Sequence, residues 1–249
     1  MIDIHFHCLP RIDDGPASWE EAVALCRAAA AEGTKRIVAT PHVLRDPWLN
    51  ANPVARDRLL VSLNNRLKGS PQVLAGCEYL FSDQAISLIK RKETNPLTGL
   101  ARGSYLLIEF EPGFVSPKTA AVFHELAVLG VRPVVAHPER NRVFSREPKR
   151  LAELVRRGAV VQITAGSLLG DFGRTAQEAC DEFFRLGIVH AVASDAHSML
   201  RRPPRLAAAH EWVRKEWGMD AALGLFGQNP RAILQSLPVP YVPGSRDRS

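Results

Sequence analysis

The chain of 249 residues lacks several features that mark well-known classes of protein. Its four cysteines are scattered and form no Cys-x-x-Cys pair, so neither a disulfide framework nor a zinc ribbon is indicated. No apolar run approaches the roughly 18–20 residues of a membrane span, and no signal peptide precedes the first strand-like segment. No basic run is interleaved with aromatics, so nucleic-acid binding is not favoured. We therefore expect a reduced, cytoplasmic globular protein.

The composition is that of an ordinary soluble domain. Hydrophobic residues make up 46% of the chain and charged residues 23%, and the length suits one sizeable core better than two small domains. The net charge of +6 comes mostly from an excess of arginine and suits an anionic substrate. An arginine-rich, solvated surface would explain the charge equally well.

Short apolar runs alternate with amphipathic stretches along the chain. The runs are rich in Val, Ile and Leu, as buried parallel strands are, and lie at 2–4, 36–39, 72–76, 105–108, 133–136, 160–163 and 188–193. Helices are expected from a Ser18–Glu21 capping box to Gly33, and near 53–68, 84–92, 117–129, 147–157, 175–186 and 205–216. About seven β-α units predict an α/β fold, a single TIM-like (β/α)7 barrel over residues 1–237. The Pro-, Gly- and Arg-rich tail, 238–249, is expected to fray.

The first apolar run ends in a His-x-His pair, His5 and His7. Residues i and i+2 of a strand point to the same face, so both imidazoles can face one metal ion. A core strand gains nothing from two histidines, because each buried imidazole needs a hydrogen-bond partner. On its own, the pair leaves a metal site and another use about equally open.

Polar motifs follow most of the other apolar runs. Thr40-Pro41-His42 follows the second, Glu78 the third, Glu109 the fourth, His137-Pro138-Glu139-Arg140 the fifth and Ser194-Asp195-Ala196-His197 the seventh. The carboxyl ends of the strands in a parallel barrel open on one face, so these side chains are expected to converge. Each motif alone has an ordinary explanation, such as a strand-end turn, a surface carboxylate or a helix cap; the combination is what is specific.

Two further positions complete the candidate mouth. Asp14 lies in an Asp-Asp-Gly segment that is a common turn, but the loop must cross the same mouth, which makes Asp14 a credible ligand. The sixth run, which ends at 164–166, brings no obvious ligand. Histidines and carboxylates without cysteine suit Mn, Fe or Zn, and their number favours more than one ion. Without cations, such crowded charges would repel and be costly to bury.

The motifs Asp-x-His-x-His, Thr-Pro-His, the isolated Glu, His-Pro-Glu-Arg and Ser-Asp-Ala-His, in this order, resemble the polymerase-and-histidinol-phosphatase (PHP) superfamily. The segments 9–10, 12–15, 107–110, 136–141 and 202–204 resemble one branch, the manganese-dependent bacterial protein tyrosine phosphatases of capsule and exopolysaccharide operons. The similarity extends from residue 1 to about 235. Two features depart from the branch: Val43 follows Thr-Pro-His, and the segment 198–202 lacks the usual Asn and Gly.

The resemblance implies a distorted (β/α)7 barrel with two or three metal ions, manganese first and iron or zinc as alternatives. Its implied ligands are His5 and His7 with Asp195 for one ion, His137 for a second, Asp14, His42 and His197 for a third, and Glu78 and Glu109 as bridging or flanking carboxylates. Arg140 and Arg202 would clamp the phosphate. Arg201 is the alternative to Arg202, which we prefer because it directly precedes Pro203-Pro204.

The activity implied by the resemblance is hydrolysis of phosphotyrosine by water that the metal ions activate. The implied substrate is the phosphorylated, tyrosine-rich tail of a membrane-bound polysaccharide tyrosine kinase, which would hold this cytoplasmic protein at the inner face of the membrane. Cysteine-based catalysis is excluded, because that class needs Cys-x5-Arg. The residues six positions after the four cysteines are Asp14, Glu32, Asp83 and Leu186.

Several alternatives stay open at this point. Another PHP phosphoesterase, such as histidinol-phosphate phosphatase, would have nearly the same metal site. A non-catalytic regulator that binds phosphotyrosine would need a lost ligand, and a PHP nuclease would need a basic groove for a single strand. The sequence does not determine the native metal, the oligomeric state, the general acid, or whether segment 43–56 is a lid. We favour a loop at the site mouth, because the segment directly follows His42.

Overall fold

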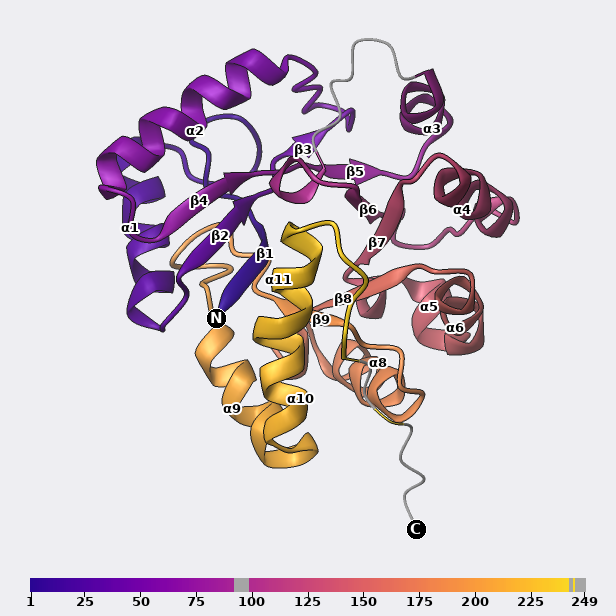
Figure 1. The fold of residues 1–249 in the computed structure, drawn as a ribbon. Helices are drawn as coiled ribbons and strands as arrows, with labels where there is room; N and C mark the ends of the chain where they lie inside the picture. The colour runs from indigo at the N-terminus through magenta and orange to yellow at the C-terminus, as the bar shows by residue number, and fades with distance from the viewer. Residues whose placement is uncertain (92–98, 242–243, 245–249) are drawn as a thin grey trace.

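Two parallel β-sheets lie at the centre of the protein and helices surround them (Figure 1). This computed structural model describes residues 1–91, 99–241 and 244. The smaller sheet has the order β1-β2-β4, with β1 (Ile2–Phe6), β2 (Arg36–Ala39) and β4 (Gln72–Ala75). The larger has the order β3-β5-β6-β7-β8-β9, with β3 (His42–Val43), β5 (Glu78–Leu80), β6 (Tyr105–Glu109), β7 (Arg132–Ala136), β8 (Val160–Thr164) and β9 (Ala191–Ala193).

A strand is present at each of the seven predicted apolar runs. Only two residues separate each of two further short strands, β3 and β5, from the ends of β2 and β4, so the chain passes from the smaller sheet into the larger at these points. On the other side of β1, a parallel bridge joins Phe6 to Ala196, three residues beyond the end of β9, and the His7 N–H donates to the Ala196 carbonyl at 2.9 Å. The described strands therefore have the predicted α/β, parallel architecture but form two sheets rather than one closed ladder.

Helices were predicted well where they are long. The helices are α1 (Trp19–Ala31), α2 (Pro53–Leu67), α3 (Asp83–Arg91), α4 (Thr119–Val128), α5 (Arg142–Arg146), α6 (Pro148–Arg156), α7 (Ala165–Leu168), α8 (Arg174–Arg185), α9 (Leu206–Trp217), α10 (Met219–Leu223) and α11 (Asn229–Leu234). The predicted capping box is present, since Ser18 accepts from the Glu21 N–H. Four helices of four to six residues each were not predicted, namely α5, α7, α10 and α11. Within the described residues, no helix is both long enough and apolar enough to cross a bilayer.

The predicted strand at 188–193 is shorter than expected. Residues 188–190 precede β9, because the Ile188 N–H donates to the Phe183 carbonyl and so closes the end of α8. In the tail, residues 238–241 are attached to the body: the Tyr241 N–H donates to the Asn229 side chain at 2.8 Å. Residues 242–243 and 245–249 of the predicted fraying tail lie outside the described residues.

Alternate strand residues fill two different parts of the core. In β6, Tyr105 and Leu107 pack with Ile4 and other residues of a central cluster, whereas Leu106 and Ile108 pack with Phe123 of α4. This alternation follows from the twofold repeat of a strand with both faces buried. Apolar side chains fill the core on both faces of the strands, and the polar side chains gather at the carboxyl ends of the strands.

His190 is buried and directly precedes β9, so it lies before the amino end of this strand rather than after its carboxyl end, where the candidate ligands are. Its Nδ1 accepts from the Val161 N–H at 3.1 Å, and burial lowers the pKa of its imidazole to about 4. In the unfolded chain the His190 imidazole has an ordinary pKa near 6.5 and is protonated at a higher pH than in the folded protein. The free energy of unfolding therefore falls as the pH drops from 6.5 to 4.

We expect this effect to reach on the order of 3 kcal/mol near pH 4. The variant His190→Asn keeps an acceptor for Val161 but does not titrate. Urea unfolding between pH 4 and 7.5 should give a flatter pH dependence for the variant than for the wild type. Parallel curves would mean that the His190 pKa is not lowered in the folded protein.

Candidate metal centre

A pocket of about 240 Å³ opens at the carboxyl ends of the strands. All nine ligands predicted from the sequence lie in it or directly beneath it: His5, His7, Asp14, His42, Glu78, Glu109, His137, Asp195 and His197. They form four overlapping clusters, in each of which one ligand atom per residue lies within 4.8 Å of the others. Eight of the nine side chains are buried, and Asp14 is partly exposed.

His5 and His7 point at the same place, as their spacing on β1 requires. Their Nε2 atoms are 3.2 Å apart. Each Nδ1 is held from behind, that of His5 by Gln162 Oε1 and that of His7 by Asp13 Oδ2, both at 2.8 Å. Because a proton on Nδ1 satisfies these contacts, both Nε2 lone pairs face the cluster, which is the arrangement typical of histidines that bind metal.

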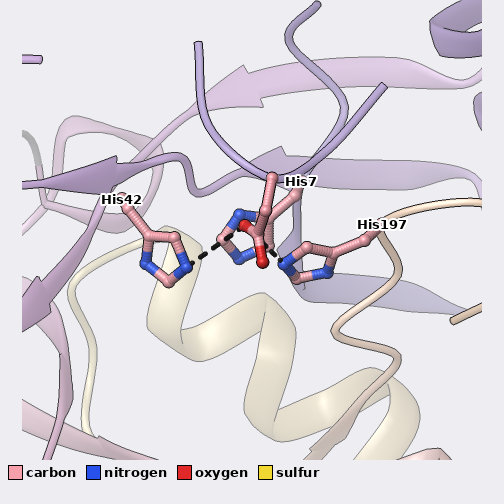
Figure 2. Close-up of side chains that lie close together, drawn as sticks. His7, His42 and His197 are labelled. Atoms are coloured by element: carbon pink, nitrogen blue, oxygen red, sulfur yellow. Dashed lines mark ion pairs between the residues drawn. The ribbon is translucent and has the colours of Figure 1, made fainter. Parts of the chain in front are cut away.

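A second cluster surrounds Asp14. The imidazoles of His7, His42 and His197 face a common point between them (Figure 2). Asp14 Oδ1 lies 3.4 Å from the Nε2 atom of His42 and 3.2 Å from that of His197. The His197 Nδ1 contacts the Asp195 carbonyl at 2.8 Å, and its buried Nε2 makes no hydrogen bond of proper geometry with the described residues.

Glu78 joins the clusters. Its Oε2 lies 3.4 Å from the Nε2 atoms of both His5 and His7 and 3.1 Å from His42 Nδ1, while its Oε1 lies 2.8 Å from His137 Nε2. His42 and Glu78 are neighbours because they are paired across β3 and β5. The sequence placed both residues after strands, whereas each is the first residue of a short strand of the larger sheet.

Two candidate ligands have unusual backbone conformations. His137 has a φ of 32° directly after β7, and Asp195 a φ of 52° just after β9. Left-handed conformations of residues other than glycine cost roughly 1–3 kcal/mol each and gather at functional sites. Here the abrupt turn at the strand end directs each side chain into the pocket.

The pKa values show that the cluster is not electrostatically balanced by its own residues. Burial opposes charge on every member, yet Glu78 and Asp195 raise the pKa of His5 to about 9. Burial, together with repulsion from Glu78, raises the pKa of Glu109 to about 7. Burial and the neighbouring Arg140 lower the pKa of His137 to about 4. Divalent cations would stabilise the charged carboxylates and the neutral imidazoles together.

The donor set therefore fits metal ions. It consists of nitrogen and oxygen ligands without sulfur, which suits Mn, Fe or Zn rather than copper(I) or an iron–sulfur cluster. Metal coordination would satisfy the His197 Nε2, which makes no hydrogen bond with the described residues, and the facing Nε2 atoms of His5 and His7.

Arg140 and Arg202 border the same pocket. Arg140 donates to Asp195 Oδ2, and Arg202 bridges Asp195 at 3.1 Å and Asp14 Oδ2 at 3.0 Å. Arg201, the alternative, is exposed in the turn between the bridged residues Ser198 and Arg202 and is not among the residues that line the pocket.

The structure adds supporting residues that the sequence did not reveal. Asp13 and Gln162 hold the first two histidines, as described above. Glu139, between His137 and Arg140, is buried and accepts from the Thr164 N–H at 3.0 Å and the Ser167 hydroxyl at 2.7 Å, which ties this turn to the end of β8. The acidic pair at 13–14 was a visible signal, but Gln162 is an ordinary residue in the middle of a strand.

The segment after His42 lies at the pocket mouth. Residues 44–52 form a loop before α2, and Arg45 in this loop contacts Glu109 at 2.7 Å. The Trp48 ring stacks on His42 with centroids 5.2 Å apart. The loop position expected from the sequence is therefore present, whereas the last part of the segment 43–56 already belongs to α2.

This geometry agrees with what comparison with known proteins shows. The family described as capsular polysaccharide synthesis, CpsB/CapC, matches residues 1–235. The chain belongs to this family. Among its relatives, the tyrosine-protein phosphatase YwqE of Bacillus subtilis is 37% identical over 224 residues, 88% of this chain and 86% of YwqE. The tyrosine-protein phosphatase CpsB of Streptococcus pneumoniae is 30% identical over 241 residues, 94% of this chain and 98% of CpsB.

Solved structures extend the comparison of this CpsB/CapC member to the whole fold. A crystal structure from the work on YwqE and CpsB, which are described there as unique metal-dependent tyrosine phosphatases, matches with a TM-score of 0.91 and 33% identity and covers all of both chains. A mutant organophosphorus hydrolase matches with a TM-score of 0.59 at 13% identity over 94% of this chain and 92% of its own. The second likeness shows a shared fold alone.

Proposed function

We propose that the chain is a metal-dependent protein tyrosine phosphatase. The observation that carries the proposal is the convergence of nine nitrogen and oxygen ligands with two arginines in one pocket. Its relatives YwqE and CpsB are named tyrosine-protein phosphatases, and they align with this chain over most of its length. Manganese is the proposed metal, in two or three ions, with iron or zinc as alternatives.

The proposed ligands are the nine residues of the cluster, and Arg140 and Arg202 are the proposed phosphate clamp. When bound, the ions supply positive charge for the phosphoryl oxygens and a water molecule of lowered pKa. The two guanidiniums both contact Asp195, itself a candidate ligand, so they would hold the phosphate against the ions. Their planar forks suit bidentate binding of phosphate oxygens. His5 and His7 keep their Nε2 atoms aimed at the centre through Gln162 and Asp13.

The finer expectations about architecture and partners belong to the same proposal. The two sheets would form a distorted (β/α)7 barrel within a single domain over 1–237, with 238–249 as a tail. The proposed substrate is the phosphorylated, tyrosine-rich tail of a membrane-bound polysaccharide tyrosine kinase, to which a positively charged protein is attracted. Such a partner would keep a cytoplasmic enzyme at the inner face of the membrane.

The test compares phosphate release from a phosphotyrosyl peptide and from histidinol phosphate, each with Mn²⁺ and with a chelator. We expect strong release from the peptide that depends on Mn²⁺ and disappears with the chelator. Preference for histidinol phosphate would keep the metal site but move the protein to another phosphoesterase activity. Bound metal without turnover of either substrate would favour a phosphotyrosine-binding regulator.

The same assay separates metal-dependent from cysteine-dependent chemistry. All four cysteines are fully buried thiols, and none is followed by an arginine six positions later. Pretreatment of the folded protein with iodoacetamide should therefore leave the Mn²⁺-dependent rate unchanged within about twofold. Stoichiometric loss of activity with alkylation of one cysteine would contradict the proposed chemistry.

A further inference from the structure

The loop between α7 and α8 contributes an aromatic residue to the pocket. The sixth apolar run brings no ligand, yet Phe172, eight residues beyond the end of β8, lines the pocket together with Arg140. Its ring covers the guanidinium, with Arg140 Cζ 4.5 Å from the ring centroid. Phe110 and Phe144 also line the pocket but are 7% and 0% exposed, whereas Phe172 is only partly buried. Of these three rings, Phe172 is the one with surface left for a ligand.

The loop is built to keep this ring in place. Asp171 is ion-paired with Arg205 at 2.6 Å, and its N–H donates to the Gly166 carbonyl at 2.8 Å. The Phe172 ring packs directly over Gly166: a Cβ there would lie 3.0 Å from Phe172 Cε2. The missing side chain at Gly166 therefore permits the close approach that sets the ring against Arg140.

We propose that Phe172 determines specificity for aryl phosphate esters by packing against the aromatic ring of the substrate. This inference rests on the proposed phosphatase function. In an aryl phosphate, the ring begins one oxygen atom from phosphorus, so a phosphate held by Arg140 places it near the residue that covers Arg140. Contacts between aromatic rings favour binding beyond simple burial, and an alkyl ester would not gain them.

The test uses two ligands that are not hydrolysed, benzylphosphonate and ethylphosphonate, with Mn²⁺-saturated protein and isothermal titration calorimetry. Wild type should bind benzylphosphonate about three- to tenfold more tightly. Phe172→Leu should bring this ratio close to one, and Phe172→Tyr should restore it. Phe114→Leu is the matched control, because Phe114 is 59% exposed on the loop after β6 and does not line the pocket.

The ratio separates ring recognition from an effect on Arg140. If Phe172 only positions Arg140, Phe172→Leu will weaken both ligands equally, and the proposal is wrong. It is equally wrong if the ratio is unchanged or if wild type shows no preference. Phe172→Met replaces the Leu variant if that variant does not fold. Failure of the tyrosine phosphatase function would instead appear as absent turnover of the phosphopeptide by wild type, which binding of these ligands does not require.

Discussion

Replacing Glu78 with glutamine should reduce phosphatase turnover on the order of 10³-fold. Glu78 lies within 3.4 Å of four imidazoles, so one carboxylate contacts most of the proposed metal cluster. The amide of glutamine has nearly the same shape, but it is neutral and its nitrogen cannot ligate a cation. The loss corresponds to several kcal/mol of charge stabilisation that the ions provide in the transition state.

Glu78→Gln should weaken metal binding as well as lower the rate of hydrolysis. Thermal unfolding with and without Mn²⁺ should show a clear rise in Tm for wild type and a much smaller one for Glu78→Gln, because a ligand that binds only the folded state stabilises it. Glu111→Gln is the matched control: Glu111 is an exposed carboxylate that lines the same pocket but belongs to none of the four ligand clusters in the described chain. Equal losses in both variants would show that general pocket charge, rather than ligation, is responsible.

The positions of the candidate ligands could be predicted because parallel strands impose a simple rule. A polar residue at the carboxyl end of a buried parallel strand lies at the one face on which all these strand ends open. A histidine or carboxylate at this position stands out in the sequence against the Val, Ile and Leu of the strand. His137 and Asp195 follow this rule, with the sharp left-handed turns that aim them inward. His42 and Glu78 were found by the same rule although they begin strands of their own, since strands of two and three residues are too short to show a repeat in the sequence.

Residues that act through a neighbour could not be predicted in this way. Gln162 is buried in the middle of β8, and its role depends on the distance from its Oε1 to His5, a contact across 157 residues of sequence. Glu139 was named only as part of a motif, and its partners Thr164 and Ser167 become neighbours through strand pairing. Phe172 depends on a loop whose shape is set by Asp171 and Gly166. Short helices such as α7 were missed because four residues cannot show a helical repeat.

The sequence left open whether Arg201 or Arg202 binds the phosphate, and replacing Arg202 is the second change with a large expected effect on activity. Arg201 and Arg202 are adjacent, carry the same charge and belong to one turn, but Arg202 lines the pocket and contacts Asp14 and Asp195, while Arg201 is exposed. Arg202→Ala should lower kcat/KM for the phosphopeptide on the order of 10²-fold, the usual loss when one charged donor to the transition state is removed. Arg201→Ala, its matched control, should stay within about twofold of wild type.

Because Arg202 also contacts two candidate ligands, its loss must be separated from loss of metal. If Arg202 clamps the phosphate, Arg202→Ala should keep its metal content and the rise in Tm with Mn²⁺, while inhibition by inorganic phosphate weakens in parallel with kcat/KM. Arg202→Lys should recover part of the activity, since lysine restores the charge but not the bidentate fork. A variant that loses metal together with activity would make Arg202 a support for Asp14 and Asp195, and a loss confined to Arg201→Ala would assign the clamp to Arg201.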